Sequence, residues 1–174
     1  MLAARYDLLR RFPFIPTEDD MCRRRKQRLP SNAYAIDGSI WHVTITVARP
    51  NGAPFRSIEF GLETLDDFAT SCQEAGAIVH LICLMPDHLH TLVEVHVDDL
   101  IKVVGRAKSA TTRIWWTRGG TGALWQQSFY DHGIRGDQDF EATVTYLLNN
   151  PIEAGLVEEW ETYPLIGGAL ISDD

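Results

Sequence analysis

Two histidines separated by a single aliphatic residue, His88 and His90, combine the residue type and the spacing of a metal-binding pair. Side chains alternate along an extended strand, so both imidazoles would project from one face and could bind one divalent cation. The pair alone is also compatible with a zinc site or with two partly buried histidines that bind no ion. Further ligands must decide between these interpretations.

Tyr146 and Asn150 form a second candidate group. Residues four apart on a helix lie nearly above one another, so the phenol and the amide would share a face. A helical wheel separates Tyr146 from the residues predicted to pack on the sheet, which are Phe140, Val144, Leu147 and Leu148. An aromatic ring on the polar face beside an amide is unusual for pure packing, although it could simply cover a rim.

Two imidazoles, an amide and a phenol together suit phosphoryl transfer to a tyrosine. A phenol has a pKa of about 10 and is a poor nucleophile at neutral pH. A divalent cation helps because it polarises the phosphodiester and neutralises charge on the leaving oxygen. Neutral imidazoles and an amide oxygen leave the cation its full charge. This mixture of nitrogen and oxygen ligands suits Mn²⁺, and also Mg²⁺ if the site is open.

Four predicted strands and three predicted helices would position these side chains. The strands cover Ile40–Val47, Ala77–Met85, Leu89–Val97 and Leu124–Ile134, and the helices cover Leu62–Ala75, Leu100–Trp116 and Phe140–Asn149. Only Pro86–His88 separates the second and third strands, which predicts a hairpin with the histidine pair where its second strand begins. We expect Asp137 to cap the last helix and Pro151 to end it, because the residue before proline is pushed out of helical geometry.

This order, β-α-β-β-α-β, is the ferredoxin-like pattern. We therefore predict an α+β fold with a four-stranded antiparallel sheet and a C-terminal helix that carries Tyr146. A length of 174 residues and a hydrophobic content of 45% suit one domain, expected over residues 37–165. A basic arm (1–36) would precede this domain and an acidic tail (166–174) would follow it.

The charge distribution gives a mixed indication of nucleic-acid binding. The net charge of −8 argues against binding by bulk attraction, yet residues 1–37 hold eight of the sixteen Lys and Arg. A second basic stripe follows the helix over 100–116, opposite its predicted core side. A charge run is most often only a solvated face. The candidate DNA contacts are Arg23, Arg24, Arg25, Lys26, Lys102, Arg106, Lys108 and Arg113.

Three scattered cysteines do not predict a disulfide framework, so a reducing, cytoplasmic environment is expected. The first sixteen residues do not resemble a secretory signal, and no apolar run approaches the length of a membrane span. We therefore expect no membrane partner.

Several motifs of the chain resemble those of the REP-associated tyrosine transposases, bacterial relatives of the single-tyrosine HUH transposases with an IS200-like domain. They are Met85–His90, Lys108–Ser109, Leu124–Gln126, Tyr130–Arg135 and Tyr146–Val157. The resemblance runs from about Gly38 to Tyr163. One departure is Asp87, where many relatives have asparagine, which adds a negative charge beside the proposed cation.

The resemblance implies that residues 37–165 form a ferredoxin-like HUH domain that cleaves and joins single-stranded DNA. The positions that match the family's ligands for Mg²⁺ or Mn²⁺ are His88, His90 and Asn150. Tyr146 would be the catalytic nucleophile and would give a 5′-phosphotyrosine link with a free 3′-hydroxyl. The implied substrates are hairpin or palindromic DNA, and the implied protein is a bacterial, cytoplasmic monomer or homodimer.

Two other functions remain open at this point. One is a non-catalytic, domesticated module that binds hairpin DNA or RNA on its sheet and basic stripe. The other is a zinc hydrolase in which a carboxylate such as Asp87 or Glu94 joins the histidines. Intact His88, His90, Tyr146 and Asn150 favour the nuclease, since a binding module has no need of all four.

Overall fold

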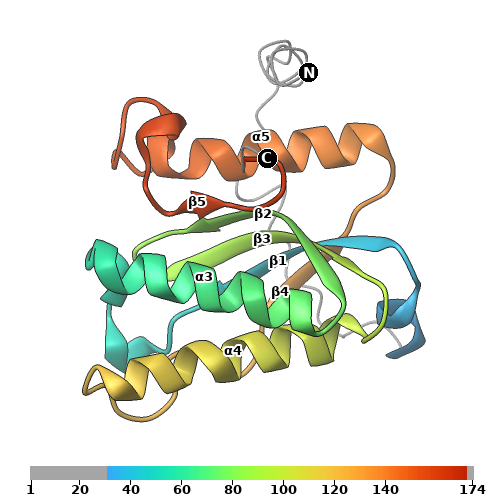
Figure 1. Cartoon of the computed structure of the whole chain (residues 1–174). Coiled ribbons are helices and arrows are strands. Elements are labelled where there is room, and N and C mark those ends of the chain that lie inside the picture. Colours follow the sequence, from blue (N-terminus) through green and yellow to red (C-terminus); the bar gives the residue numbers. More distant parts are fainter. Residues whose placement is uncertain (1–30, 172–174) are drawn as a thin grey trace.

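The computed structural model describes residues 31–171, in which five antiparallel strands form one sheet with helices on both faces (Figure 1). The strands are β1 (Ser39–Thr46), β2 (Ala77–Leu84), β3 (His88–Val95), β4 (Tyr130–Gly133) and β5 (Ile166–Gly167). The α-helices are α3 (Ile58–Glu74), α4 (Leu100–Thr117) and α5 (Asp137–Glu153). Short 3-10 turns are η1 (Ser31–Ala35), η2 (Arg49–Asn51), η3 (Pro54–Arg56) and η4 (Trp160–Thr162). Helices α3 and α4 cover one face of the sheet and α5 covers the other (Figure 1).

The strand order β4-β1-β3-β2-β5 confirms the α+β prediction, since its first four strands have the order expected of a ferredoxin-like β-α-β-β-α-β chain. The predicted count of four strands is corrected to five by β5, which pairs with β2 at the edge of the sheet. This strand falls at the start of the predicted acidic tail. It pairs because Tyr163 and Leu165, just before it, are buried against β2, where the Leu84 amide donates to the Leu165 carbonyl.

Each face of the sheet has its own hydrophobic core, because alternate residues of a strand point to opposite faces. On the α3 and α4 side, Val43, Ile45 and Val93 pack with the helices. On the α5 side a smaller cluster contains Leu81, Leu92, Val144, Tyr146, Leu147 and Leu148. The even-numbered residues of β1 and β3 therefore face α5, and they include both histidines of the pair.

Helix α5 differs from its prediction at both ends. Its N-cap is Gly136 rather than Asp137, which is the first helical residue. Pro151 lies inside the helix instead of ending it. The helix ends at a Schellman motif, in which the amides of Gly155 and Leu156 donate to the carbonyls of Ile152 and Pro151. Gly155 has a φ of 66°, a left-handed conformation that favours glycine.

The predicted fourth strand, 124–134, is a strand only at Tyr130–Gly133, with one isolated bridge between Trp125 and Val47. The intervening segment bonds to α4 instead of extending the ladder. The Trp125 indole donates to the Thr111 hydroxyl, and the ammonium group of Lys108 donates to two carbonyls, those of Gln126 and Gln127. Among the described residues, no helix combines the length and the apolar character that a membrane span requires.

Candidate active site

His88 and His90 lie together at the start of β3, on the α5 face of the sheet, as the sequence predicted. Their ring centroids are 4.8 Å apart and the rings are nearly perpendicular. His88 is half-buried, whereas His90 is only 4% exposed. Two adjacent imidazoles of this kind can present nitrogen donors to one ion.

The Nδ1 atom of His88 is occupied by its neighbour in the chain. It lies 2.7 Å from Oδ1 of Asp87, whose side chain is mostly exposed. The carboxylate accepts a hydrogen bond there, so Nε2 of His88 is the nitrogen left to bind an ion. A carboxylate that holds the second ring nitrogen is a common partner of metal-binding histidines.

The Nδ1 atom of His90 contacts two side chains of β1. It lies 3.0 Å from Oγ1 of Thr44 and 3.2 Å from Nε2 of His42. Burial lowers the pKa of His90, and burial followed by repulsion from His132 lowers the pKa of His42 to about 3. Both rings are therefore neutral at neutral pH, which is the form in which imidazole binds metal.

His42 and Thr44 were not predicted to be part of the site. Their spacing of two residues matches that of His88 and His90, and this was the available signal. It becomes informative only with the strand order, because Thr44 lies directly opposite His90 in the pairing of β1 with β3.

Tyr146 lies against the same rings, and this corrects the prediction that it sits on the polar face of its helix. It is 3% exposed, with its ring centroid 5.5 Å from that of His90 and 5.9 Å from that of His42. The buried side of α5 is therefore wider than predicted, since it includes Tyr146, which lies against the imidazole rings of His42 and His90. Further along the helix, the same buried side packs on Leu81 and Leu92.

Asn150 follows Tyr146 by one helical turn, as predicted, and its amide Nδ2 donates to the Tyr146 carbonyl at 2.8 Å. That bond fixes the side chain against the helix and leaves Oδ1 as the group that can bind a cation. Within residues 31–171, no three side chains drawn from His, Cys, Asp and Glu form a cation site. A third protein ligand beside the two histidines would therefore be of another type, such as this amide.

Two further groups flank the site on β4. The ring of Tyr130 lies 6.2 Å from that of His42 between centroids. His132 lies opposite His42 in the pairing of β1 with β4, and its Nε2 is 3.1 Å from Oδ2 of Asp139 in the first turn of α5. Asp139 also accepts from the Arg135 amide and so joins the start of α5 to the end of β4.

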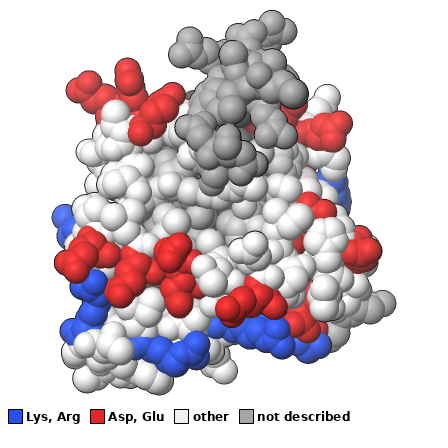
Figure 2. All heavy atoms as spheres, viewed as in Figure 1, with Lys and Arg blue, Asp and Glu red and all other residues white. Residues whose placement is uncertain are grey.

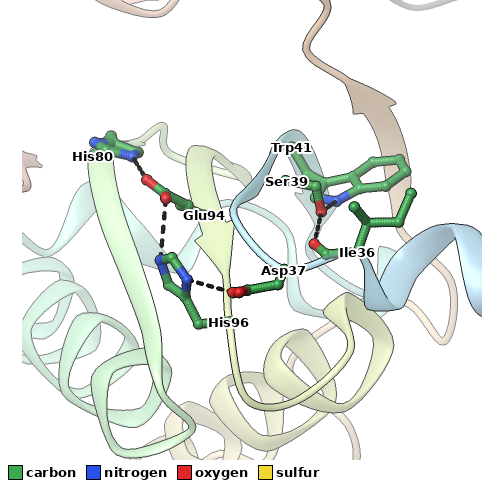
Figure 3. Close-up of polar contacts among 7 residues, drawn as sticks. All are labelled: Ile36, Asp37, Ser39, Trp41, His80, Glu94 and His96. Carbon is green, nitrogen blue, oxygen red and sulfur yellow. Dashed lines mark hydrogen bonds and ion pairs between the residues drawn. The ribbon is translucent and has the colours of Figure 1, made fainter.

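Glu94 lies outside this site although it shares its strand and face. Its carboxylate contacts His80 at 2.7 Å and His96 at 3.1 Å, and His96 in turn contacts Asp37 (Figure 3). Four residues along a strand separate Glu94 from His90, a rise of about 13 Å. Glu94, one of the two carboxylates considered for a zinc hydrolase, therefore belongs to a different cluster.

The predicted DNA contacts of α4 lie on the opposite side of the sheet from Tyr146. Lys102 pairs with Asp98 and Asp99, and Arg106 pairs with Asp98 at 2.7 Å. Figure 2 shows this mixture, with basic side chains along the lower edge over α4 and acidic side chains just above them. Arg113 is exposed on the same helix. The cluster Arg23, Arg24, Arg25 and Lys26 lies outside the described residues.

Comparisons with known proteins agree with the resemblance found in the motifs. The family model described as "Transposase IS200 like" matches residues 56–150. A curated relative from Haemophilus influenzae, named "Putative REP-associated tyrosine transposase", is 26% identical over 112 residues, which cover 56% of this chain and 62% of the relative. The chain thus matches less than two thirds of that relative's length.

A solved structure, described as "Structure of the REP associates tyrosine transposase bound to a REP hairpin", superposes with a TM-score of 0.67. The match covers 82% of each chain at 20% sequence identity. At this identity the likeness establishes a shared fold.

Proposed function

The chain belongs to the IS200-like transposase family, and from this premise we propose that it is a metal-dependent single-stranded DNA endonuclease and strand transferase. Tyr146 is the nucleophile in this proposal. The observation that carries it is the contact of the Tyr146 ring with the buried ring of His90, at 5.5 Å between centroids. The contact supports the proposal because it sets a phenol beside the pair of imidazoles that we propose as metal ligands.

The residues present fit a divalent cation. Both histidines have Nδ1 engaged, so each offers Nε2, and Asn150 offers an amide oxygen. We assign His88, His90 and Asn150 as ligands of Mg²⁺ or Mn²⁺, which accept mixed nitrogen and oxygen ligation. When bound, the cation would polarise the phosphodiester and stabilise charge on the leaving oxygen.

The proposed reaction exchanges one phosphodiester for another. The Tyr146 oxygen attacks phosphorus and loses its proton to solvent, while the bond from phosphorus to the 3′-oxygen breaks and that oxygen takes up a proton. The products are a 5′-phosphotyrosine and a free 3′-hydroxyl, and reversal rejoins strands. Because Tyr146 is only 3% exposed, we expect side chains around it to move before a phosphate reaches its hydroxyl.

We propose hairpin or palindromic DNA as the substrate. This rests on the family and on the solved structure of similar fold, whose description names a bound REP hairpin. We assign the phosphate contacts to Arg113, Lys102, Arg106 and the Arg23–Lys26 cluster. Lys102 and Arg106 are paired with carboxylates, so they would have to exchange these partners for phosphates. Lys108 can contribute only if it releases its carbonyl partners.

The test is covalent capture of DNA by the full-length protein. With hairpin single-stranded DNA and Mn²⁺, we expect adducts that survive denaturation. Tyr146→Phe should abolish them, and Tyr130→Phe, which alters the other phenol near His42, should retain them. His88→Ala, His90→Ala and Asn150→Ala should lower the yield at limiting Mn²⁺. Undiminished adducts in Tyr146→Phe would contradict the proposal, and hairpin binding without any adduct in either cation would favour the non-catalytic module.

A further inference from the structure

We propose that His42 and Thr44 of β1 are positioning residues that fix the tautomer of His90 and so present its Nε2 to the cation. This inference rests on the proposed metal site and goes beyond it, because it concerns two residues outside the proposed set of metal ligands. It gives a reason for the buried histidine, His42, on β1, the strand that pairs with the strand of His88 and His90.

The contacts converge on one atom. Nδ1 of His90 lies 3.0 Å from the Thr44 hydroxyl and 3.2 Å from Nε2 of His42. Thr44 is directly opposite His90 in the strand pairing, and His42 is two residues away on the same face. Both partners come from β1, which pairs with β3 and β4 on its two sides, so their positions are set by backbone hydrogen bonds rather than by a loop.

These contacts select one of two tautomers. A histidine that binds a cation through Nε2 must carry its hydrogen on Nδ1. The Thr44 oxygen can accept that hydrogen, and so can Nε2 of His42. If His42 instead donated from its Nε2, then Nδ1 of His90 would have to accept. The ring hydrogen of His90 would then lie on its own Nε2 and block the atom that binds the cation. We infer that the Thr44 hydroxyl donates to Nε2 of His42, 3.5 Å away, which leaves its oxygen to accept from Nδ1 of His90 at 3.0 Å and so favours the binding tautomer.

An unsatisfied atom on His42 is consistent with this role. When Nε2 of His42 accepts, its hydrogen is on Nδ1, and that atom is buried with no hydrogen-bond partner among the described residues. A buried polar atom without a partner costs free energy. A residue kept only for packing would avoid this cost by being apolar. The imidazole is better explained by its contact with His90.

Metal affinity and histidine tautomer test the inference without reference to cleavage. Binding of Mn²⁺ to the full-length protein, without DNA, is followed by electron paramagnetic resonance of the free ion. We expect Thr44→Val and His42→Phe to weaken binding roughly 10- to 100-fold, the usual effect of removing such a partner. Thr44→Ser and His42→Gln, which retain a polar atom for Nδ1, should stay close to the unaltered protein.

Thr64→Val is the control for the same threonine-to-valine change, because Thr64 is buried on α3 and its hydroxyl makes no hydrogen bond within the described residues. It should leave Mn²⁺ affinity unchanged. Nitrogen-15 shifts of the His90 ring provide the second measurement. We expect the Nδ1–H form in the metal-free protein and a shift toward Nε2–H in Thr44→Val.

The outcomes separate this inference from the proposed site. If His90→Ala abolishes Mn²⁺ binding but Thr44→Val and His42→Phe bind normally, the inference is wrong and the metal site stands. If neither His88→Ala nor His90→Ala affects Mn²⁺ binding, the metal site is wrong. In either case, a metal-free His90 found mainly as Nε2–H contradicts the inference, and an Nδ1–H form that disappears in Thr44→Val supports it.

Discussion

Each of the two histidines of β3 contacts other side chains through its Nδ1 atom, but the partners are of different kinds. Asp87, whose side chain is 59% exposed, contacts Nδ1 of His88, whereas the buried His42 and the half-buried Thr44 contact Nδ1 of His90. A carboxylate strengthens an imidazole ligand more than a hydroxyl does, because it stabilises positive charge on the ring. His88 should therefore be the stronger donor, although it is the more exposed of the two.

Replacing the carboxylate at Asp87 tests this difference. Asp87→Asn keeps an oxygen that can accept from His88 but removes its charge. We expect Mn²⁺ affinity to fall by up to about tenfold. This is the low end of the losses found when a hydrogen-bond partner of a metal-binding histidine is replaced. Glu158→Gln, which removes an exposed carboxylate outside the site, is the control for net charge. Equal affinities of Asp87→Asn and the unaltered protein in a calorimetric titration would show that the carboxylate does not support the ligand.

Spacing made His88, His90, Tyr146 and Asn150 candidates, because strand and helix periodicities place each pair on one face. It left other interpretations of each pair open, and their proposed roles came from the family resemblance. Spacing could not identify His42 or Thr44, since their relevance depends on the pairing of β1 with β3. It also placed Tyr146 on the polar face, because the ring's partners are other rings and not aliphatic side chains.

Helix α5 is the element that determines the geometry of the site, because it carries Tyr146 and Asn150 near its C-terminal end. Its end was misplaced at Pro151, which lies inside the helix; the helix ends later, at a Schellman motif that satisfies the carbonyls of Pro151 and Ile152. The signal for the true end was Gly155, which supplies the left-handed residue. Strands β1, β2 and β3 were predicted within two residues because their apolar runs are strong.

Gly155→Ala should loosen the last turn of α5. An added Cβ meets no atom within 4 Å, so the cost comes from the left-handed backbone, about 1 kcal/mol. Urea unfolding should show that decrease in stability, and hydrogen exchange should be faster in the last turn. Gly105→Ala is the control, because its Cβ also meets nothing and it lies within α4, where alanine is favoured over glycine. A stability of Gly155→Ala equal to that of Gly105→Ala would contradict this account.

Across the whole molecule, the proposed nucleophile and the basic stripe of α4 lie on opposite sides of the sheet. DNA that reaches Tyr146 must therefore extend around the domain if it also contacts the stripe. This separation could not be predicted from the helix periodicity, which shows that the stripe is opposite the core but not which face of the sheet the helix covers.

The salt dependence of hairpin binding tests the stripe. For the triple substitution Lys102→Ala, Arg106→Ala and Arg113→Ala, the logarithmic salt slope should fall by about 0.7 for each phosphate that the variant no longer neutralises. Arg118→Ala, which removes a cation paired with Glu59 and Glu63 at the end of the same helix, is the control and should leave the slope unchanged. If the salt slope is unchanged in the triple variant, the stripe does not contact DNA phosphates.

The stability of the whole domain should fall at alkaline pH. Burial raises the pKa of Cys72 and of Cys83 to about 12 from 9.0. Below pH 9 both states keep these thiols protonated. Above pH 9, these thiols ionise only in the unfolded chain. The free energy of unfolding therefore falls as pH rises from 9 toward 12, by about 1.4 kcal/mol per pH unit for each thiol. Urea unfolding across this range should show a shallower fall when both are replaced by alanine, and equal slopes would contradict the assignment.

The bond that we propose between Tyr146 and DNA can be located by mass spectrometry of the covalent adduct. The full-length protein is incubated with hairpin single-stranded DNA and Mn²⁺, denatured, and digested with nuclease and protease. We expect a nucleotide mass on the peptide that contains Tyr146, attached through the tyrosine oxygen to a 5′-phosphate. A nucleotide found on Tyr130 or on any other residue, with Tyr146 unmodified, would contradict it.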